Sequence, residues 1–176
     1  MMTIFYILIG IILVLIILGI VSPKDYEVSR SIVIDRELKE VFNFLKYLKN
    51  QYQWSPWEKK DPNMVKSYIG TDGEVGFISR WKGNKGVGEG EQEIITIIEN
   101  ESIDTQLRFF KPWKSESIGH ILVDDVDETQ TIVTWGFSGR NKFPFSVFML
   151  FMSMDKMIGK DFEEGLTNLK KVLEKK

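Results

Sequence analysis

His120 is the one imidazole in this 176-residue chain, and the chain contains no cysteine. A single histidine excludes a two-histidine metal site and a Ser-His-Asp arrangement with a second histidine in reserve. Without a thiol there is neither a cysteine nucleophile nor a zinc–thiolate site. His120 follows Gly119 inside a predicted strand, where a structural or exposed role is the simpler interpretation. We therefore predict no catalytic residue.

Carboxylates gather at two places. Glu89, Glu91 and Glu93 project from one strand face at a period of two, and three carboxylates can bind a cation. The loop spacing typical of a hard-ion site does not surround them, so a solvated strand face is the favoured interpretation. The second group, at 124–128, is explained as the tip of a β-hairpin. We predict no metal ion and no cofactor.

Aromatic residues of three predicted strands could line a binding site: Phe77, Trp81, Phe109, Trp135 and Phe137. Within a strand, residues an even number of positions apart face the same side, so Trp135 and Phe137 share a face. Two interpretations stay open. The rings fill a core, or they line an apolar pocket with a few polar groups such as Ser79, Arg80 and Arg108. No acid–base pair accompanies the rings, which counts against demanding chemistry.

The elements that must position these residues follow from the periods of the apolar residues. Residues 26–34 predict a strand, and Asp35 is a suitable N-cap for an amphipathic helix that runs to Leu48. Residues 52–57 suggest a helical turn. From Asn63 the period changes to two and predicts six strands, at 65–70, 75–81, 86–98, 103–110, 115–126 and 129–138. The short connections predict an antiparallel meander.

A long C-terminal helix is predicted from one apolar stripe, made of Met154, Ile158, Phe162, Leu166, Leu169 and Leu173. Gly159 and Gly165 each cost this helix about 1 kcal/mol against Ala. They are explained if the helix backbone presses closely on a sheet. A curved antiparallel sheet gripping this helix, an α+β architecture, would bury the stripe and leave a hollow between the two.

The N-terminus is uncharged from Met1 to Pro23 apart from the terminal amine, with an almost unbroken apolar run from Ile4 to Val21. About 20 such residues span a bilayer's hydrocarbon core. A signal peptide is the alternative, but no basic residue precedes the run and Pro23 follows the would-be cleavage site. We predict an uncleaved anchor over 1–23 and one domain over 24–176.

The charges of that domain favour a cytoplasmic location and argue against a nucleic-acid partner. Basic residues follow the apolar run and none precedes it, in the pattern of the positive-inside rule: Lys24, Arg30, Arg36 and Lys39. The net charge is −2, with Lys and Glu interspersed rather than gathered in a basic stripe. We expect a single-pass membrane protein with a monomeric domain.

Motifs along 26–173 resemble the START-like (SRPBCC) superfamily, in particular its bacterial polyketide cyclase/dehydrase-type branch. They include Trp54-Ser55-Pro56-Trp57, Trp81-x-Gly83-Asn84-Lys85, Phe110-Lys111-Pro112, Trp135-x-Phe137-Ser138-Gly139 and the stretch 154–166. The resemblance implies the helix-grip (START/Bet v 1-like) fold, with about seven strands around the C-terminal helix. It also implies a ligand cavity between sheet and helix, so that Ile158 and Phe162 join Phe77, Ser79, Trp81, Phe109, Trp135 and Phe137 as candidate lining residues.

Three functions are compatible with this reasoning, because such folds host carriers, cyclases and chaperone regulators alike. The favoured one is membrane-tethered binding of a hydrophobic small molecule or lipid. A cyclase- or dehydratase-like enzyme acting on a polyketide-like substrate would show an apolar pocket with a buried ionisable group. A protein-interaction module would show a filled core and an exposed apolar patch.

Overall fold

The computed structural model describes residues 2–175. A helix, α1 (Met2–Val21), precedes strand β1 (Asp25–Ile34), helix α2 (Leu38–Leu45), the 3-10 helix η1 (Leu48–Gln53) and α3 (Pro56–Lys59). The meander follows as β2 (Val65–Ile69), β3 (Ile78–Lys82), β4 (Glu89–Ile98), β5 (Ser102–Lys111), β6 (Ser115–Asp127) and β7 (Gln130–Arg140). Two helices end the chain, α4 (Phe145–Phe148) and α5 (Met154–Glu174).

The strands form one seven-stranded antiparallel sheet in the order β1-β7-β6-β5-β4-β3-β2. The predicted meander is therefore confirmed, and β1 completes it by pairing with β7. Two strands begin later than predicted, β3 at Ile78 and β4 at Glu89. The preceding residues turn instead, since Gly76 and Gly88 take φ angles of 90° and 74°, outside the strand region.

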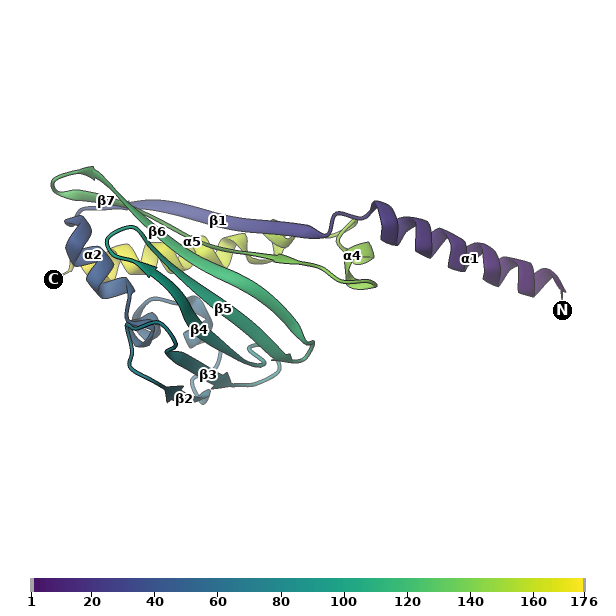
Figure 1. Ribbon diagram of the computed structural model, residues 1–176, viewed down its shortest axis with the longest axis horizontal. Coiled ribbons are helices and arrows are strands. Elements are labelled where there is room, and N and C mark those ends of the chain that lie inside the picture. The colour runs from purple at the N-terminus through teal and green to yellow at the C-terminus, as the bar shows by residue number, and fades with distance from the viewer. Residues whose placement is uncertain (1, 176) are drawn as a thin grey trace.

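Helix α5 lies along one face of the curved sheet, which we call the concave face (Figure 1). Its stripe is buried at Phe162, Leu166, Leu169 and Leu173. The predicted close approach is confirmed: a Cβ added at Gly165 would meet the ring of Trp135, and one at Gly159 would meet the guanidinium of Arg30. The absent side chains thus let α5 sit directly on β7 and β1.

The predicted N-cap at Asp35 is wrong. Helix α2 begins after Glu37, which makes no side-chain capping bond. The Asp35 carboxylate instead accepts a hydrogen bond of 2.6 Å from the side-chain amide of Gln130. Asp35 therefore joins the start of α2 to β7. The two partners are 95 residues apart, so a local sequence pattern could not predict this interaction.

Helix α1 extends away from the rest of the molecule (Figure 1), and none of its residues is buried. By length and composition it could cross a membrane, although a signal sequence near an N-terminus would meet the same criteria. The body joins α1 through a short link, in which the backbone N–H of Asn141 donates to the carbonyl of Lys24 at 2.7 Å.

Candidate ligand-binding site

The structure separates the eight candidate lining residues into two groups by burial. Phe77, Trp135, Phe137 and Phe162 are buried. Ser79, Trp81, Phe109 and Ile158 are only partly buried. All the strand members of both groups lie on the concave face, because strand register and the two-residue period place them there.

Three of the buried residues, Trp135, Phe137 and Phe162, belong to a close-packed aromatic cluster, whereas Phe77 stacks on Tyr68 at 5.9 Å. The ring of Trp135 lies 4.6 Å from that of Trp54, 5.2 Å from Trp57 and 4.6 Å from Phe162, centroid to centroid. Phe162 also stacks on Phe137 at 5.8 Å. Trp54 and Trp57 were not among the predicted lining residues. They come from α3 and the residues before it, and their position in the Trp-Ser-Pro-Trp motif was the available signal.

The strand members of the partly buried group, Ser79, Trp81 and Phe109, lie where α5 no longer covers the sheet, whereas Ile158 lies on α5 itself. Helix α5 packs against β1 and β7, whereas β2 and β3 lie at the far edge of the sheet (Figure 1). There the rings of Trp81 and Phe109 pack edge to face at 5.7 Å. Between them lies Gly90, where a Cβ would come within 2.6 Å of Trp81 Cζ2. The Trp81 ring thus lies directly against the backbone of Gly90, which has no side chain to displace it.

The next row of the same face is mixed in polarity. Register places Ser79, Gln92, Leu107 and Ser117 side by side on β3, β4, β5 and β6. We call this row together with Trp81 and Phe109 the open concave half, although its member on β6, Ser117, is itself buried. Gln92, Leu107 and Ser117 were not predicted, although strand parity would have found them: each is two residues from a concave-face position. One further row along, Ile94 and Thr105 are buried.

Tyr26 on β1 contributes a hydroxyl to this row. Its hydroxyl and that of Ser117 share a hydrogen bond of 2.7 Å. Burial raises the pKa of the Tyr26 phenol above its ordinary value of 10.0, against a smaller lowering effect of the Ser117 bond. The phenol is therefore neutral at physiological pH. Together with Gln92, which donates to Thr105 at 3.1 Å, it provides neutral hydrogen-bonding groups beside aromatic ones.

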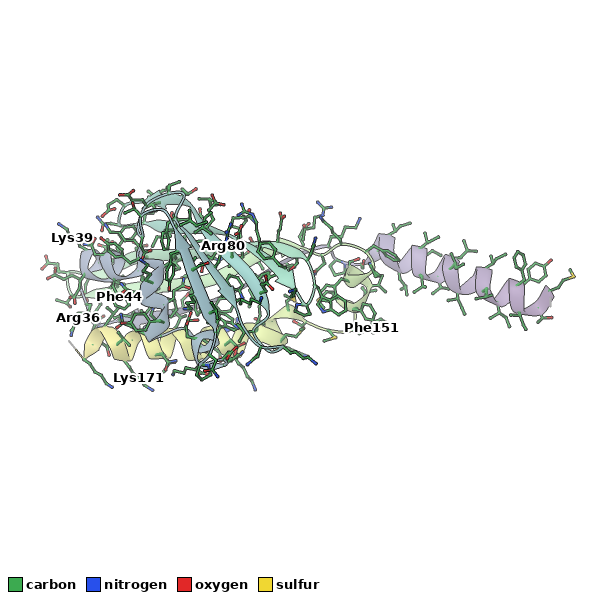
Figure 2. The ribbon with its side chains drawn as sticks, turned by 90° about the horizontal axis from the view of Figure 1, so that it is seen from below. Arg36, Lys39, Phe44, Arg80, Phe151 and Lys171 are labelled. Atoms are coloured by element: carbon green, nitrogen blue, oxygen red, sulfur yellow. The ribbon has the colours of Figure 1, made fainter. Side chains whose placement is uncertain are left out.

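The prediction that Arg80 and Arg108 belong to a pocket on the aromatic face is wrong. They alternate with concave-face residues and so lie on the opposite, convex face, where Figure 2 labels Arg80. Arg80 pairs with Glu91 at 2.8 Å, and Arg108 bridges Glu91 and Glu93 at 2.9 and 2.7 Å. These arginines neutralise the acidic strand face and are not available to a concave-face ligand.

The three glutamates of β4 are accordingly paired rather than simply solvated. Glu89 pairs with Lys111 at 2.9 Å, and Glu91 is only 7% exposed. Burial works to raise the pKa of the Glu91 carboxyl, but the hydrogen bonds and charges of Arg80 and Arg108 hold it below its ordinary value. Within residues 2–175 no group of acidic or histidine side chains is arranged to hold a metal ion.

Replacing Arg108 by Met should destabilise the domain in a pH-dependent way. A lowered pKa means that the ionised Glu91 stabilises the fold above its ordinary pKa, and that this stabilisation is lost as pH falls through the folded-state pKa. Arg108→Met should therefore cost about 1–3 kcal/mol at pH 7 and progressively less in acid. Urea unfolding of the full chain in mild detergent, followed by tryptophan fluorescence, measures this difference.

The matched control is Arg140→Met, because Arg140 is mostly exposed and its nitrogen lies 3.7 Å from Asp25. That variant should change stability little at any pH. An Arg108→Met penalty that stays constant between neutral and acidic pH would contradict the role given to Glu91.

The other acidic and titratable candidates have structural roles. Asp127 accepts hydrogen bonds from the backbone and hydroxyl of Thr129 at 2.8 and 2.9 Å, which forms the predicted hairpin tip between β6 and β7. His120 is partly buried on β6 beside Gly136, a convex-face position away from the aromatic groups. Neither is placed to act on a concave-face ligand.

A surface hollow of about 400 Å³ lies between η1, α3 and β2, outside the predicted residues. Its charged lining residues are mostly engaged: Lys66 pairs with Glu58, and Asp61 accepts a backbone hydrogen bond from Asn84 at 2.6 Å. Lys49 lies over the ring of Tyr68 at 4.7 Å. These interactions hold η1 and α3 against the sheet edge.

Comparison with known proteins identifies the fold. A truncated norcoclaurine synthase from Thalictrum flavum is 11% identical, with a TM-score of 0.66 over 87% of this chain and 96% of that one. The same enzyme with dopamine and hydroxybenzaldehyde is 12% identical, with a TM-score of 0.62 over 90% and 92%. A Nitrosospira multiformis protein is 19% identical, with a TM-score of 0.55 over 82% and 94%.

The chain therefore has the helix-grip fold of the START/Bet v 1-like class, as the sequence predicted. No protein-family model matches the sequence, and no curated protein does. At such low identities the structural likeness shows the fold and not the activity. The function must be argued from this chain's own residues.

Proposed function

We propose that this protein is a single-pass, membrane-tethered module that binds a hydrophobic small molecule or lipid on its open concave half. The observation that carries the proposal is the burial gradient along the concave face. The row that holds Phe77, Ile94 and Thr105 is buried, whereas Trp81, Phe109 and Leu107 stay partly exposed. An apolar surface with a few neutral polar groups is the usual composition of a small-molecule site.

The chemistry of the open concave half indicates the kind of ligand. Trp81, Phe109 and Leu107 offer apolar contact to a hydrophobic body. The Tyr26 phenol and the Gln92 amide are neutral, which suits a carbonyl or hydroxyl on the ligand better than a charged group. Norcoclaurine synthase, which has the same fold, was solved with dopamine and hydroxybenzaldehyde, and this supports aromatic ligands as a class to test.

The tether proposed here is α1, with an anchor over 1–23 and the binding domain over 24–176. Its apolar side chains are exposed along the whole helix, and it has no polar face to turn toward water. The basic residues that follow it, from Lys24 to Lys39, support a cytoplasmic domain. A membrane anchor also suits a protein whose ligand is a lipid or partitions into lipid.

A cyclase- or dehydratase-like enzyme is the second candidate, favoured by one observation. Tyr26 is an ionisable group held neutral beside the ring of Phe137, 5.2 Å away between centroids, and a neutral phenol can donate a hydrogen bond to a reacting carbonyl. An enzyme of this kind would lose turnover with Tyr26→Phe while still binding its substrate. A pure binding module would show only a modest change in affinity.

Replacing Trp81 by Ala tests the proposed site. Native mass spectrometry of the full chain released from membranes identifies any co-purifying small molecule, and an apolar fluorescent probe serves as the ligand for titration. Trp81→Ala should weaken probe binding about ten- to a hundredfold, since loss of a large apolar contact is worth about 1.5–3 kcal/mol. Stability should change less than at a fully buried tryptophan, because Trp81 is partly exposed.

Tyr52→Ala is the control, because Tyr52 is 64% exposed on η1 and lies outside the open concave half. Its loss should leave probe affinity unchanged. Stoichiometric binding that Trp81→Ala does not weaken would place the ligand elsewhere, and no stoichiometric binding at all would end the carrier proposal.

A further inference from the structure

A second apolar surface lies immediately beside α1. The segment 143–152, between β7 and α5, exposes six large apolar side chains: Phe143, Phe145, Phe148, Leu150, Phe151 and Met152. Phe151 is 81% exposed, whereas Ser146 and Val147 of the same segment are buried. The segment is thus folded onto the domain on one side and presents its aromatic side chains outward. Soluble proteins seldom expose so many large apolar groups together.

The position of this segment relative to α1 follows from direct contacts. Helices α1 and α4 touch, and a Cβ on Gly19 would lie 3.0 Å from Cδ2 of Phe143. Gly19 is two residues before the end of α1 at Val21, about 3 Å along the helix axis. If α1 spans the bilayer, Phe143 therefore lies at the depth of the last turn of the span, where hydrocarbon meets headgroups.

Basic residues lie next to this apolar segment. Lys24 and Lys142 are exposed on either side of the junction, and Arg140 is 67% exposed at the end of β7. Exposed aromatic side chains next to Lys and Arg are the composition of a segment that inserts into a membrane surface, where the cations meet anionic headgroups. At ten residues the segment is too short to span the bilayer itself.

We infer that the segment 143–152 is a second membrane contact, which inserts into the bilayer interface beside α1. This inference rests on the proposed tether. Two attachments at one end would hold the domain in a single orientation on the membrane rather than on a free link. Figure 2 shows Phe151 at the end of the domain that α1 joins, with Arg36, Lys39 and Lys171 at the opposite end.

The orientation has a consequence for the ligand. Tyr26 lies one residue beyond the start of β1, and Ser117 pairs with the Tyr26 hydroxyl near the start of β6. The open concave half therefore lies at the α1 end of the sheet, toward the inserted segment. A hydrophobic ligand could pass between the bilayer and this surface without crossing bulk water.

Site-specific labelling tests the inference, and the absence of cysteine makes single-cysteine variants of the full chain straightforward. An environment-sensitive fluorophore is placed at Met152→Cys, Ile12→Cys or Lys171→Cys, and each protein is reconstituted into vesicles containing anionic lipid. Nitroxide-labelled lipids quench fluorophores in the bilayer, and aqueous iodide quenches those in water. We expect labels at 12 and 152 to be quenched several-fold more by the lipid than the label at 171, with the reverse order for iodide.

A double change, Phe148→Ser with Phe151→Ser, should reduce lipid quenching at position 152 and leave position 12 unchanged. If the label at 12 is lipid-quenched but the label at 152 is as open to iodide as that at 171, the inference fails and the tether stands. If position 12 is not quenched by lipid, both fail. If the label at 152 becomes less accessible to iodide as the protein density in the vesicles rises, yet is not quenched by lipid nitroxide, the segment contacts a second copy of the protein. That result would also overturn the inference.

Discussion

Replacing Trp135 by Ala is expected to cost the domain about 3–5 kcal/mol of unfolding free energy, the usual range for a large buried aromatic. Trp135 is 7% exposed and contacts the rings of Trp54, Trp57 and Phe162. Its loss would leave a void at the point where α3, α5 and β7 meet. Thermal unfolding of the full chain in mild detergent, followed by circular dichroism, should show a midpoint lowered on the order of 10 °C.

Trp81→Ala is the matched comparison, since it removes the same side chain from the partly exposed end of the same face. The two variants should separate, with Trp135→Ala losing stability and Trp81→Ala losing probe affinity. Similar stability losses in both would mean that Trp81 is packed as tightly as Trp135. The open concave half would then be part of the core, and the proposed site would be wrong.

Removing residues 1–22 should release the protein from membranes while leaving a folded, monomeric domain. The full chain should stay in the membrane fraction after washing with high salt and alkaline carbonate, because about 20 apolar residues insert effectively irreversibly. The shortened chain should move to the supernatant. Because the shortened chain keeps only the segment 143–152 as a membrane contact, we expect it to bind vesicles weakly and less so at higher salt.

Fractionation with size-exclusion chromatography and circular dichroism measures this release. The domain should fold because its core, from Val28 to Leu173, draws on no residue of α1. Aggregation of the shortened chain where the full chain behaves well in detergent would contradict that independence. Mass spectrometry of the protein isolated from cells provides a second check: a mature N-terminus near Ser22 would identify a cleaved signal peptide and end the anchor proposal.

The repeating elements of this fold could be predicted because their signals are local. A two-residue period predicted the meander, and a three- to four-residue period predicted α5 with its buried Leu166 and Leu169. Gly159 and Gly165 predicted the close contact of helix and sheet, which Arg30 and Trp135 confirm. Each of these inferences needs only the side-chain direction within one element.

Strand alternation could predict on which face of the sheet a candidate residue lies, but not whether α5 covers it. Alternation correctly placed Trp135 and Phe137 on one face, and the same rule applied strictly would have put Arg80 on the face opposite to Trp81 and Arg108 on the face opposite to Phe109. Parity cannot say how far along a strand the covering helix reaches. Phe137 and Trp81 occupy equivalent faces, yet one is buried under α5 and the other lies beyond it.

The apolar α1 and the order of the elements could be predicted from the sequence because hydrophobic period and turn residues act over short distances, and the motif resemblance then implied the helix-grip fold. Three features follow from the folded arrangement alone: which end of the concave face stays open, the bridge from Arg108 to Glu91 and Glu93, and the contact of segment 143–152 with Gly19. Those features join residues far apart in the chain. Their positions are set by sheet curvature and helix placement, which are properties of the packed whole and not of any one segment.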